Sequence, residues 1–232
     1  MNFSVTQNGK ELDKSKYTWD EKTKTFSTNE SNLTLDFSNL NSVTFNTGHN
    51  CTFKTGSYCT FKTGSYCTFN TGHICTFKTG SYCTFKTGSH CTFNTDSYCT
   101  FNTGYYCTFN TDSYCTFNTG YYCTFKTGWN CTFNTGSYCT FKTGSDCTFN
   151  TGHNCTFNTS HNCTFEVGEK CCLHYCWNGC FEVYKLEPNK LIKILVNGQL
   201  EYIQKKTETQ IQIEKLEHEL QILKEKYLKE QK

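Results

Sequence analysis

Apolar and polar residues alternate with a period of two inside a longer period of eight along residues 51–166. Each octapeptide reads Cys-Thr-Phe-(Asn/Lys)-Thr-Gly-x-x with few deviations. In an extended chain, positions one, three and five lie on one side and positions two and four on the other. Gly at position six is expected to supply the left-handed backbone of a corner. Each repeat therefore predicts one strand and one turn, with Cys and Phe inward and with Thr, Asn and Lys toward solvent.

A repeat this short cannot bury a core alone, so its copies must stack on one another. Two repeats would close a flattened coil of sixteen residues, and three would close a triangular coil of twenty-four. The shorter coil is favoured because its opposed strands set each Cys against a Phe across a core about 10 Å thick. Residues 91–106 also recur unchanged at 107–122, a duplication of one such coil. The sequence thus predicts an all-β, two-sided parallel β-solenoid.

The register extends beyond the perfect repeats, because Val43 and Leu35 occupy the Cys position ahead of Phe45 and Phe37. Aliphatic residues at this position indicate that Cys is mainly a buried apolar filler. The solenoid would then have about nine coils and a length of about 45 Å, at roughly 4.8 Å per coil. We expect four segments, namely an N-terminal cap, the octapeptide solenoid, a C-terminal cap hairpin and an amphipathic helix, at residues 1–34, 35–182, 183–198 and 199–232.

The two flanks of the repeats are predicted to cap the stack. An open end would expose unpaired strand edges and would aggregate. Before the repeats, residues 16–19 and 24–26 predict one hairpin. After them, residues 181–186 and 191–196 flank a turn that contains Pro188 and predict a second hairpin.

Beyond Asn197 and Gly198 the hydrophobic period becomes helical. Apolar residues follow the spacing of coiled-coil a and d positions at Ile213, Leu216, Leu220, Leu223 and Tyr227. Glu219 and Lys224 occupy g and e positions with the right signs for an interchain pair. We expect a homo-oligomer through this helix. Because only about two and a half heptads are present, a helix packed on the end of the solenoid, or a frayed one, is the alternative.

Composition limits the expected cellular location of the protein and the kinds of partner it can bind. A net charge of +2 gives no global field toward nucleic acid or an acidic membrane. No segment approaches the roughly 18 apolar residues of a membrane span, and residues 1–8 lack the pattern of a signal peptide. An intracellular protein of the host cytoplasm, or a component of a particle assembled there, is expected. The nineteen cysteines are odd in number and follow the repeat, so we expect most to be reduced.

The octapeptide run, together with residues 181–196, resembles the short-repeat β-solenoid proteins of large DNA viruses and phages. The resemblance covers about residues 35–196. It implies the solenoid fold and brings no catalytic residue to this chain. Pentapeptide-repeat proteins match less well, because their DNA-mimicking members are acidic. Insect antifreeze solenoids also match less well, because they carry Thr-x-Thr faces on twelve-residue coils.

The repeated cysteines can be interpreted as metal ligands, as disulfide partners or as buried packing residues. Zinc needs convergent ligands around a tetrahedral point, whereas the repeated Cys residues would form a line. Stacked Cα atoms about 4.8 Å apart fall inside the disulfide range, but parallel Cβ vectors would require distortion. Packing as buried thiols is favoured, and no cofactor is expected. Weak candidates for zinc are Cys172, His174, Cys176 and Cys180, which lack a paired Cys-x-x-Cys spacing. A distorted last coil is the favoured interpretation there.

Candidate binding residues lie at the corners, where sixteen-residue coils would stack tyrosines. One corner would carry Tyr66, Tyr82, Tyr98 and Tyr114, and the other Tyr106, Tyr122 and Tyr138 joined by Tyr105, Tyr121 and Trp129. Such rows can contact a protein partner, a glycan or single-stranded bases, or simply stabilise the coil. Nucleic acid is disfavoured because isolated Lys residues without Arg make a poor phosphate track.

The sequence disfavours two further activities, ice binding and catalysis. Outward Thr columns would suit ice binding, but Lys residues interrupt the lattice at Lys54, Lys62, Lys78, Lys86, Lys126 and Lys142. No nucleophile–base–acid set or phosphate loop is present, so we expect no enzyme. The predicted function is a structural rod or spacer, such as a virion or filament component, that presents side-chain ladders to protein partners. The alternative is a binding module that uses the Tyr rows for glycan or single-stranded nucleic acid.

Overall fold

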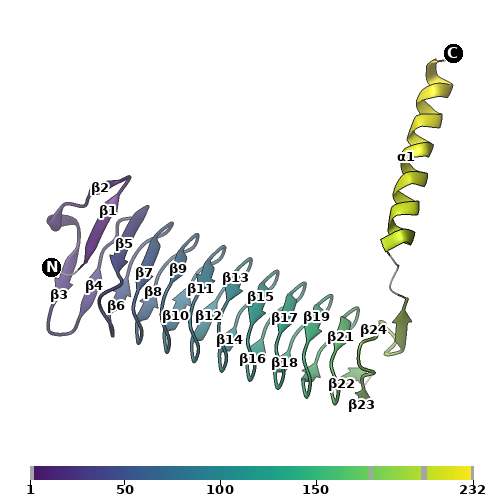
Figure 1. Cartoon of the computed structure of the whole chain (residues 1–232). Coiled ribbons are helices and arrows are strands. Elements are labelled where there is room, and N and C mark those ends of the chain that lie inside the picture. The colour runs from purple at the N-terminus through teal and green to yellow at the C-terminus, as the bar shows by residue number, and fades with distance from the viewer. Residues whose placement is uncertain (1–2, 178–179, 205–207, 231–232) are drawn as a thin grey trace.

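The computed structural model describes residues 3–177, 180–204 and 208–230. It is an all-β parallel solenoid of about nine coils with sixteen residues per coil, followed by one helix (Figure 1). In-register pairing of residues sixteen apart, such as Thr76 with Thr92 and Phe77 with Phe93, confirms the predicted coil length. Successive strands of the coil alternate between two sheets.

In each of the two sheets, neighbouring strands are hydrogen-bonded in the following order. The first sheet contains β2 (Lys10–Glu11), β1 (Ser4–Gln7), β5 (Leu33–Phe37), β7 (Thr52–Thr55), β9 (Thr68–Asn70), β11 (Thr84–Lys86), β13 (Thr100–Asn102), β15 (Thr116–Thr119), β17 (Thr132–Thr135), β19 (Thr148–Thr151), β21 (Thr164–Val167), β24 (Leu191–Ile194) and β25 (Leu200–Ile203). The second sheet contains β23 (Cys180–Lys185), β22 (Cys172–Trp177), β20 (Thr156–Asn158), β18 (Thr140–Lys142), β16 (Thr124–Lys126), β14 (Thr108–Asn110), β12 (Thr92–Thr95), β10 (Thr76–Thr79), β8 (Thr60–Lys62), β6 (Thr44–Asn46), β4 (Thr25–Ser27) and β3 (Thr18–Asp20). The remaining elements are η1 (Lys14–Lys16) and α1 (Glu208–Glu230).

The core is built from two columns of Phe. Phe77 stacks on Phe93 of the same sheet, with ring centroids 4.8 Å apart and an angle of 3° between the ring planes. It meets Phe85 of the opposite sheet edge-on at 5.2 Å and 76°. Burying each ring contributes about 2 kcal/mol, and the ring pairs add about 1 kcal/mol.

The expected pairing of Cys with Phe across the core is wrong, because Phe faces Phe. Opposed strands run in opposite directions about a central Phe, so position one faces position five instead of position three. Cys59 accordingly lies beside Thr55, across the corner that joins their strands. The predicted inward and outward positions are confirmed, as Cys51 and Phe53 are buried and Thr52 and Lys54 are exposed.

Of the two positions predicted to precede the repeats in register, Val43 is confirmed and Leu35 is wrong. Thr44 pairs with Thr60, which places Val43 at the Cys position as predicted. Leu35 instead pairs with Phe53, so Leu33 takes the Cys position. The pairing of Thr34 with Thr52 makes this coil eighteen residues long, and the two extra residues shift the register.

The N-terminal flank closes the first coil. The predicted hairpin is confirmed by the antiparallel pairing of β3 with β4. β4 also pairs in parallel with β6, so coil stacking begins inside residues 1–34, the segment expected to be only a cap. Phe3 covers the open end of the core, stacking on Phe37 at 4.2 Å and contacting Trp19 at 5.1 Å.

The predicted C-terminal hairpin is wrong. β23 pairs with β22 in the second sheet, whereas β24 pairs with β21 and β25 in the first. The segment around Pro188 therefore crosses between the sheets, as the corners between successive octapeptide strands do. β25 lies at the start of the segment predicted to be helical, and the helix begins only at Glu208.

Antiparallel strands close both sheets at both ends. At the N-terminal end these strands are β1, β2 and β3, and at the C-terminal end they are β23, β24 and β25. α1 projects away from the stack (Figure 1). Within the described ranges, no helix combines the length and the hydrophobicity needed to cross a membrane.

Candidate functional site

The corners of the coil are left-handed at position eight, and the expected left-handed Gly at position six is wrong. Tyr66 and Tyr82 have φ of 61° and 59°, and every described residue at this position from Asn50 to Lys170 has a positive φ. An L-residue in this conformation costs about 1–2 kcal/mol. The amide of Tyr66 donates to the carbonyl of Ser81 in the next coil at 3.0 Å, which offsets part of this cost.

Gly at position six provides space for a side chain of the preceding coil. A Cβ at Gly104 would overlap the hydroxyl of Ser89. That hydroxyl accepts a hydrogen bond from the amide of Tyr105 at 3.2 Å. His73 acts in the same way, its Nδ1 accepting from the amide of Ser89 at 3.1 Å beside Gly88. Corner Ser and His side chains therefore hold neighbouring coils together, a role that sequence reasoning missed.

The first tyrosine ladder (Tyr66, Tyr82, Tyr98 and Tyr114) forms as predicted. Successive rings are 4.8–5.0 Å apart and lie within 2° of parallel. Their exposed fractions run from 59% at Tyr66 to 38% at Tyr114. Trp129 continues this ladder by contacting Tyr114 edge-on at 4.8 Å. The expectation that Trp129 joins the opposite corner is therefore wrong, because it lies fifteen residues beyond Tyr114, at position seven.

The second tyrosine ladder (Tyr106, Tyr122 and Tyr138) occupies the opposite corner, as predicted. Its rings are 4.8 and 4.9 Å apart and within 12° of parallel. Tyr105 lies against Tyr106, and both contact His90 of the preceding coil. This ladder therefore extends through aromatic contacts beyond its three tyrosines.

The geometry of the ladders decides which contacts they can make. Each interior ring is covered on its faces by its neighbours, so bases or sugars cannot stack between the rings. What remains toward solvent is a row of ring edges and hydroxyl groups. Desolvation, followed by the adjacent Tyr114 and Tyr82, raises the pKa of Tyr98. Such a row suits edge-on contact with a protein surface.

The two outer faces differ, which the octapeptide consensus conceals. Six interrupting lysines were expected, and only two of them, Lys54 and Lys86, lie on the first sheet. From β13 to β19 this sheet presents an uncharged lattice of outward Thr and Asn. Its residues are Thr100, Asn102, Thr116, Asn118, Thr132, Asn134, Thr148 and Asn150. The second sheet carries the other four lysines, at Lys62, Lys78, Lys126 and Lys142.

The repeated cysteines form two buried rows of free thiols, one beside each sheet. Most of these thiols donate to two carbonyl oxygens, as Cys83 does to Ser81 at 3.6 Å and to Gly64 at 3.7 Å. Hydrogen bonds with the thiols of the adjacent coils, Cys67 and Cys99, and then burial raise the pKa of Cys83. The same kind of thiol–thiol hydrogen bond lowers the pKa of Cys67 and of Cys91, so both directions occur in both rows. The burial of the thiols agrees with the packing interpretation.

The weak zinc candidates lie on the last strand pair. Cys172 and His174 are half-buried on one face of β22, with Sγ and Nε2 3.9 Å apart. Cys176 and Cys180 belong to β22 and β23, but their side chains lie outside the described residues. Within the part of the chain that is described, no three His, Cys, Asp or Glu side chains converge on a metal position. Cys171 keeps the solenoid register, since Thr156 pairs with Cys172.

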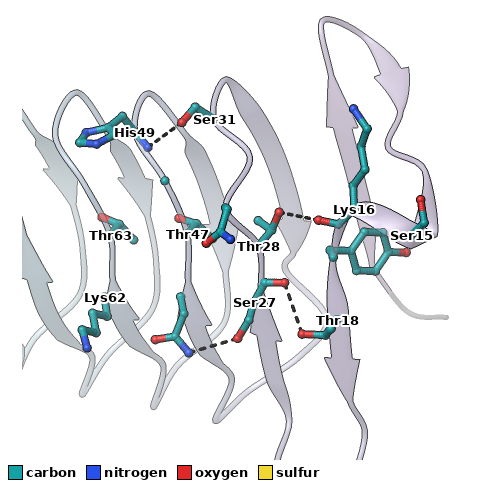
Figure 2. A pocket seen from close by; sticks show the side chains of 14 residues that line it. Ser15, Lys16, Thr18, Ser27, Thr28, Ser31, Thr47, His49, Lys62 and Thr63 are labelled. Carbon is teal, nitrogen blue, oxygen red and sulfur yellow. Dashed lines mark hydrogen bonds between the residues drawn. The ribbon is translucent and has the colours of Figure 1, made fainter.

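A polar groove of about 960 Å³ lies between the N-terminal cap and the first coils. Figure 2 shows that hydroxyl and amide side chains line it. The hydroxyl of Thr28 donates to the carbonyl of Lys16 at 2.7 Å, and the Asn46 amide donates to the Ser27 hydroxyl at 3.2 Å. The amide of His49 donates to Ser31 at 3.1 Å. These groups fasten the cap to the solenoid, so the groove is explained as part of the capping.

Helix α1 presents the predicted apolar row to solvent. Ile213, Leu216, Leu220 and Leu223 are exposed by 49–61%, and Glu219 and Lys224 are exposed beside them. The side chain of Tyr227 lies outside the described residues. The described residues of this row therefore do not pack on the end of the solenoid.

Comparison with known proteins gives no relative: no protein family, no curated protein and no solved structure matches the chain.

Proposed function

We propose that this protein is a structural rod whose copies join through α1, serving as a spacer, fibre segment or component of a virion or filament. The observation that carries the proposal is the exposed a/d row of α1 at one end of a closed, regular stack. In water, exposed apolar side chains with heptad spacing are stabilised by pairing with another helix.

Charge favours a parallel arrangement of the joined helices. In a parallel pair, the g residue of one helix faces the e residue five positions later in the other. Glu219 and Lys224 have this separation and opposite charge. The two solenoids would then extend from the same end of the helix pair, with their tyrosine ladders free to contact a protein partner.

Sedimentation of the full chain over a range of concentrations tests the joining. We expect a concentration-dependent dimer or higher oligomer, and Leu220→Glu should weaken it at least tenfold by placing a charge in the seam. Gln221→Glu adds the same charge one position away and should leave association unchanged. A full chain that stays monomeric at high concentration would refute the proposal, as would equal effects of the two variants.

Ice binding is a second candidate, favoured by the uncharged Thr and Asn lattice on the first sheet. Outward residues two apart on a strand lie about 7 Å apart, and successive coils about 4.8 Å, which gives a flat regular array. Thermal hysteresis of the full chain, lost in Thr116→Lys and kept in Thr108→Lys on the second sheet, would support this function. Absence of hysteresis would remove it.

A further inference from the structure

The two rows of buried cysteines repeat with a regular spacing along the stack of coils. Each row contains eight thiols, one per coil, from Cys51 to Cys163 beside the first sheet and from Cys59 to Cys171 beside the second. Successive thiols make the same contacts, as Cys99 donates to Ser97 and Gly80, both at 3.6 Å. Because the side chains repeat in this way, the sulfurs of adjacent coils follow the coil rise of about 4.8 Å.

That spacing matches a linear two-coordinate metal site. A zinc–thiolate bond is about 2.3 Å long, and a bond of similar length from an ion midway between two sulfurs places them about 4.6 Å apart. Linear coordination by two sulfurs is preferred by soft d10 monovalent cations, and thiolate ligands select Cu(I) over harder ions. The tetrahedral arrangement that zinc requires cannot form along a line, and three-ligand clusters are absent from the described residues for the same reason.

The surroundings of the sulfurs support a bound thiolate. The backbone amide of Cys75 donates to Sγ of Cys91 at 3.4 Å, and that of Cys155 donates to Sγ of Cys171 at 3.3 Å. Amide donors stabilise negative charge on sulfur. The position also accepts Val43 and Leu33, so packing alone does not require Cys in sixteen successive repeats.

From this geometry we infer that the two cysteine rows bind a soft monovalent d10 cation, Cu(I) in the cell, between sulfurs of adjacent coils. Each ion replaces one thiol proton, giving a thiolate–metal bond on one sulfur and a donor bond from the neighbouring neutral thiol, with one proton released to solvent. The monovalent charge balances the thiolate, so the core stays neutral, as its low polarity requires. Eight thiols form at most four such pairs per row, and the two rows together hold at most eight ions.

Ag(I) is a redox-inert probe of this site. The full chain, purified without oxygen, is titrated with Ag(I) both in the native state and during refolding, then desalted and measured by elemental analysis. We expect about eight ions per chain and one proton released per ion. Retention of three ions or fewer per chain under both loading conditions would overturn the inference, because Cys172, Cys176 and Cys180 outside the rows can hold that many.

Two double variants separate paired from independent thiols. Cys83→Val with Cys99→Val removes neighbours in one row and leaves three adjacent pairs there, so one ion is lost. Cys67→Val with Cys99→Val isolates Cys51 and Cys83, leaving two pairs, so two ions are lost. Val43 shows that Val fits this position, and circular dichroism checks the fold of both variants. An equal loss from the two variants would overturn adjacent pairing.

Discussion

The eighth residue of each octapeptide adopts a left-handed backbone conformation. Asn and Asp tolerate the left-handed region, whereas β-branched residues rarely adopt it. Ile74 does so with φ of 57° while 45% of its surface is exposed, so packing gives little in return. Asn154 occupies the equivalent corner five coils later, with φ of 56°.

Ile74→Asn should therefore stabilise the protein by about 1 kcal/mol, because it relieves the strained conformation. Asn154→Ile should destabilise it by a similar amount. The midpoint of urea unfolding, followed by circular dichroism, measures both. If Ile74→Asn lowers the midpoint, or if the two exchanges shift it in the same direction, the backbone is not what limits this position.

Alkaline pH should weaken the fold through the buried thiol of Cys99. Hydrogen bonding to Cys115, with burial, raises the pKa of Cys99 from 9.0 to about 11. The folded chain thus holds this proton more tightly than the unfolded chain, so the stabilisation is complete below pH 9 and is lost as pH rises toward 11. A two-unit shift corresponds to about 2–3 kcal/mol.

Melting temperatures at pH 8 and pH 10.5 test this expectation, with Cys99→Val as the control that has no thiol to titrate. The fall in melting temperature should be smaller in the variant. Equal falls would show that Lys or Tyr ionisation, rather than the thiol, governs alkaline unfolding.

At the scale of one corner, coils are held by a side chain that enters the space beside Gly. Ser89→Ala should cost about 1 kcal/mol by leaving the amide of Tyr105 unpaired. Gly104→Ala should cost about 1–3 kcal/mol by overlap with the Ser89 hydroxyl. The double variant should be more stable than the sum of the two losses predicts, by 0.5 kcal/mol or more, because the overlap is then reduced. Strict additivity in urea unfolding would contradict this contact.

Elements inside the octapeptide repeats could be predicted from the sequence, whereas the strands that follow the repeats could not. The inward positions of Cys51 and Phe53 followed from alternation, and the tyrosine ladders followed from the sixteen-residue coil. The conformation of Gly104 did not, because a small residue can serve either a left-handed turn or a close approach, and only the stacked coil distinguishes them. The partners of β23 and β24 also could not be read, because two strands joined by a short turn can form a hairpin or cross between sheets.

For the whole molecule, the decisive property is that one coil equals sixteen residues and both ends are closed. Deleting residues 107–122 removes one complete coil that duplicates its neighbour, so the register of both sheets and both caps is preserved. Small-angle X-ray scattering should show a rod about 5 Å shorter, since each coil adds about 4.8 Å. The melting temperature should fall by only a few degrees, because stability in such stacks is nearly a sum over neighbours.

Deleting residues 107–118 is the matched control, because twelve residues are not a multiple of the octapeptide. Tyr106 would then be followed by Thr119, which places a corner where a strand should pair and exposes Phe edges above and below the break. We expect this variant to melt at least 10 °C below the sixteen-residue deletion, or to aggregate through its unpaired edges. Equal stability of the two deletions would mean that coil register does not hold the rod together, and the stacked Phe columns could not then be its main source of stability.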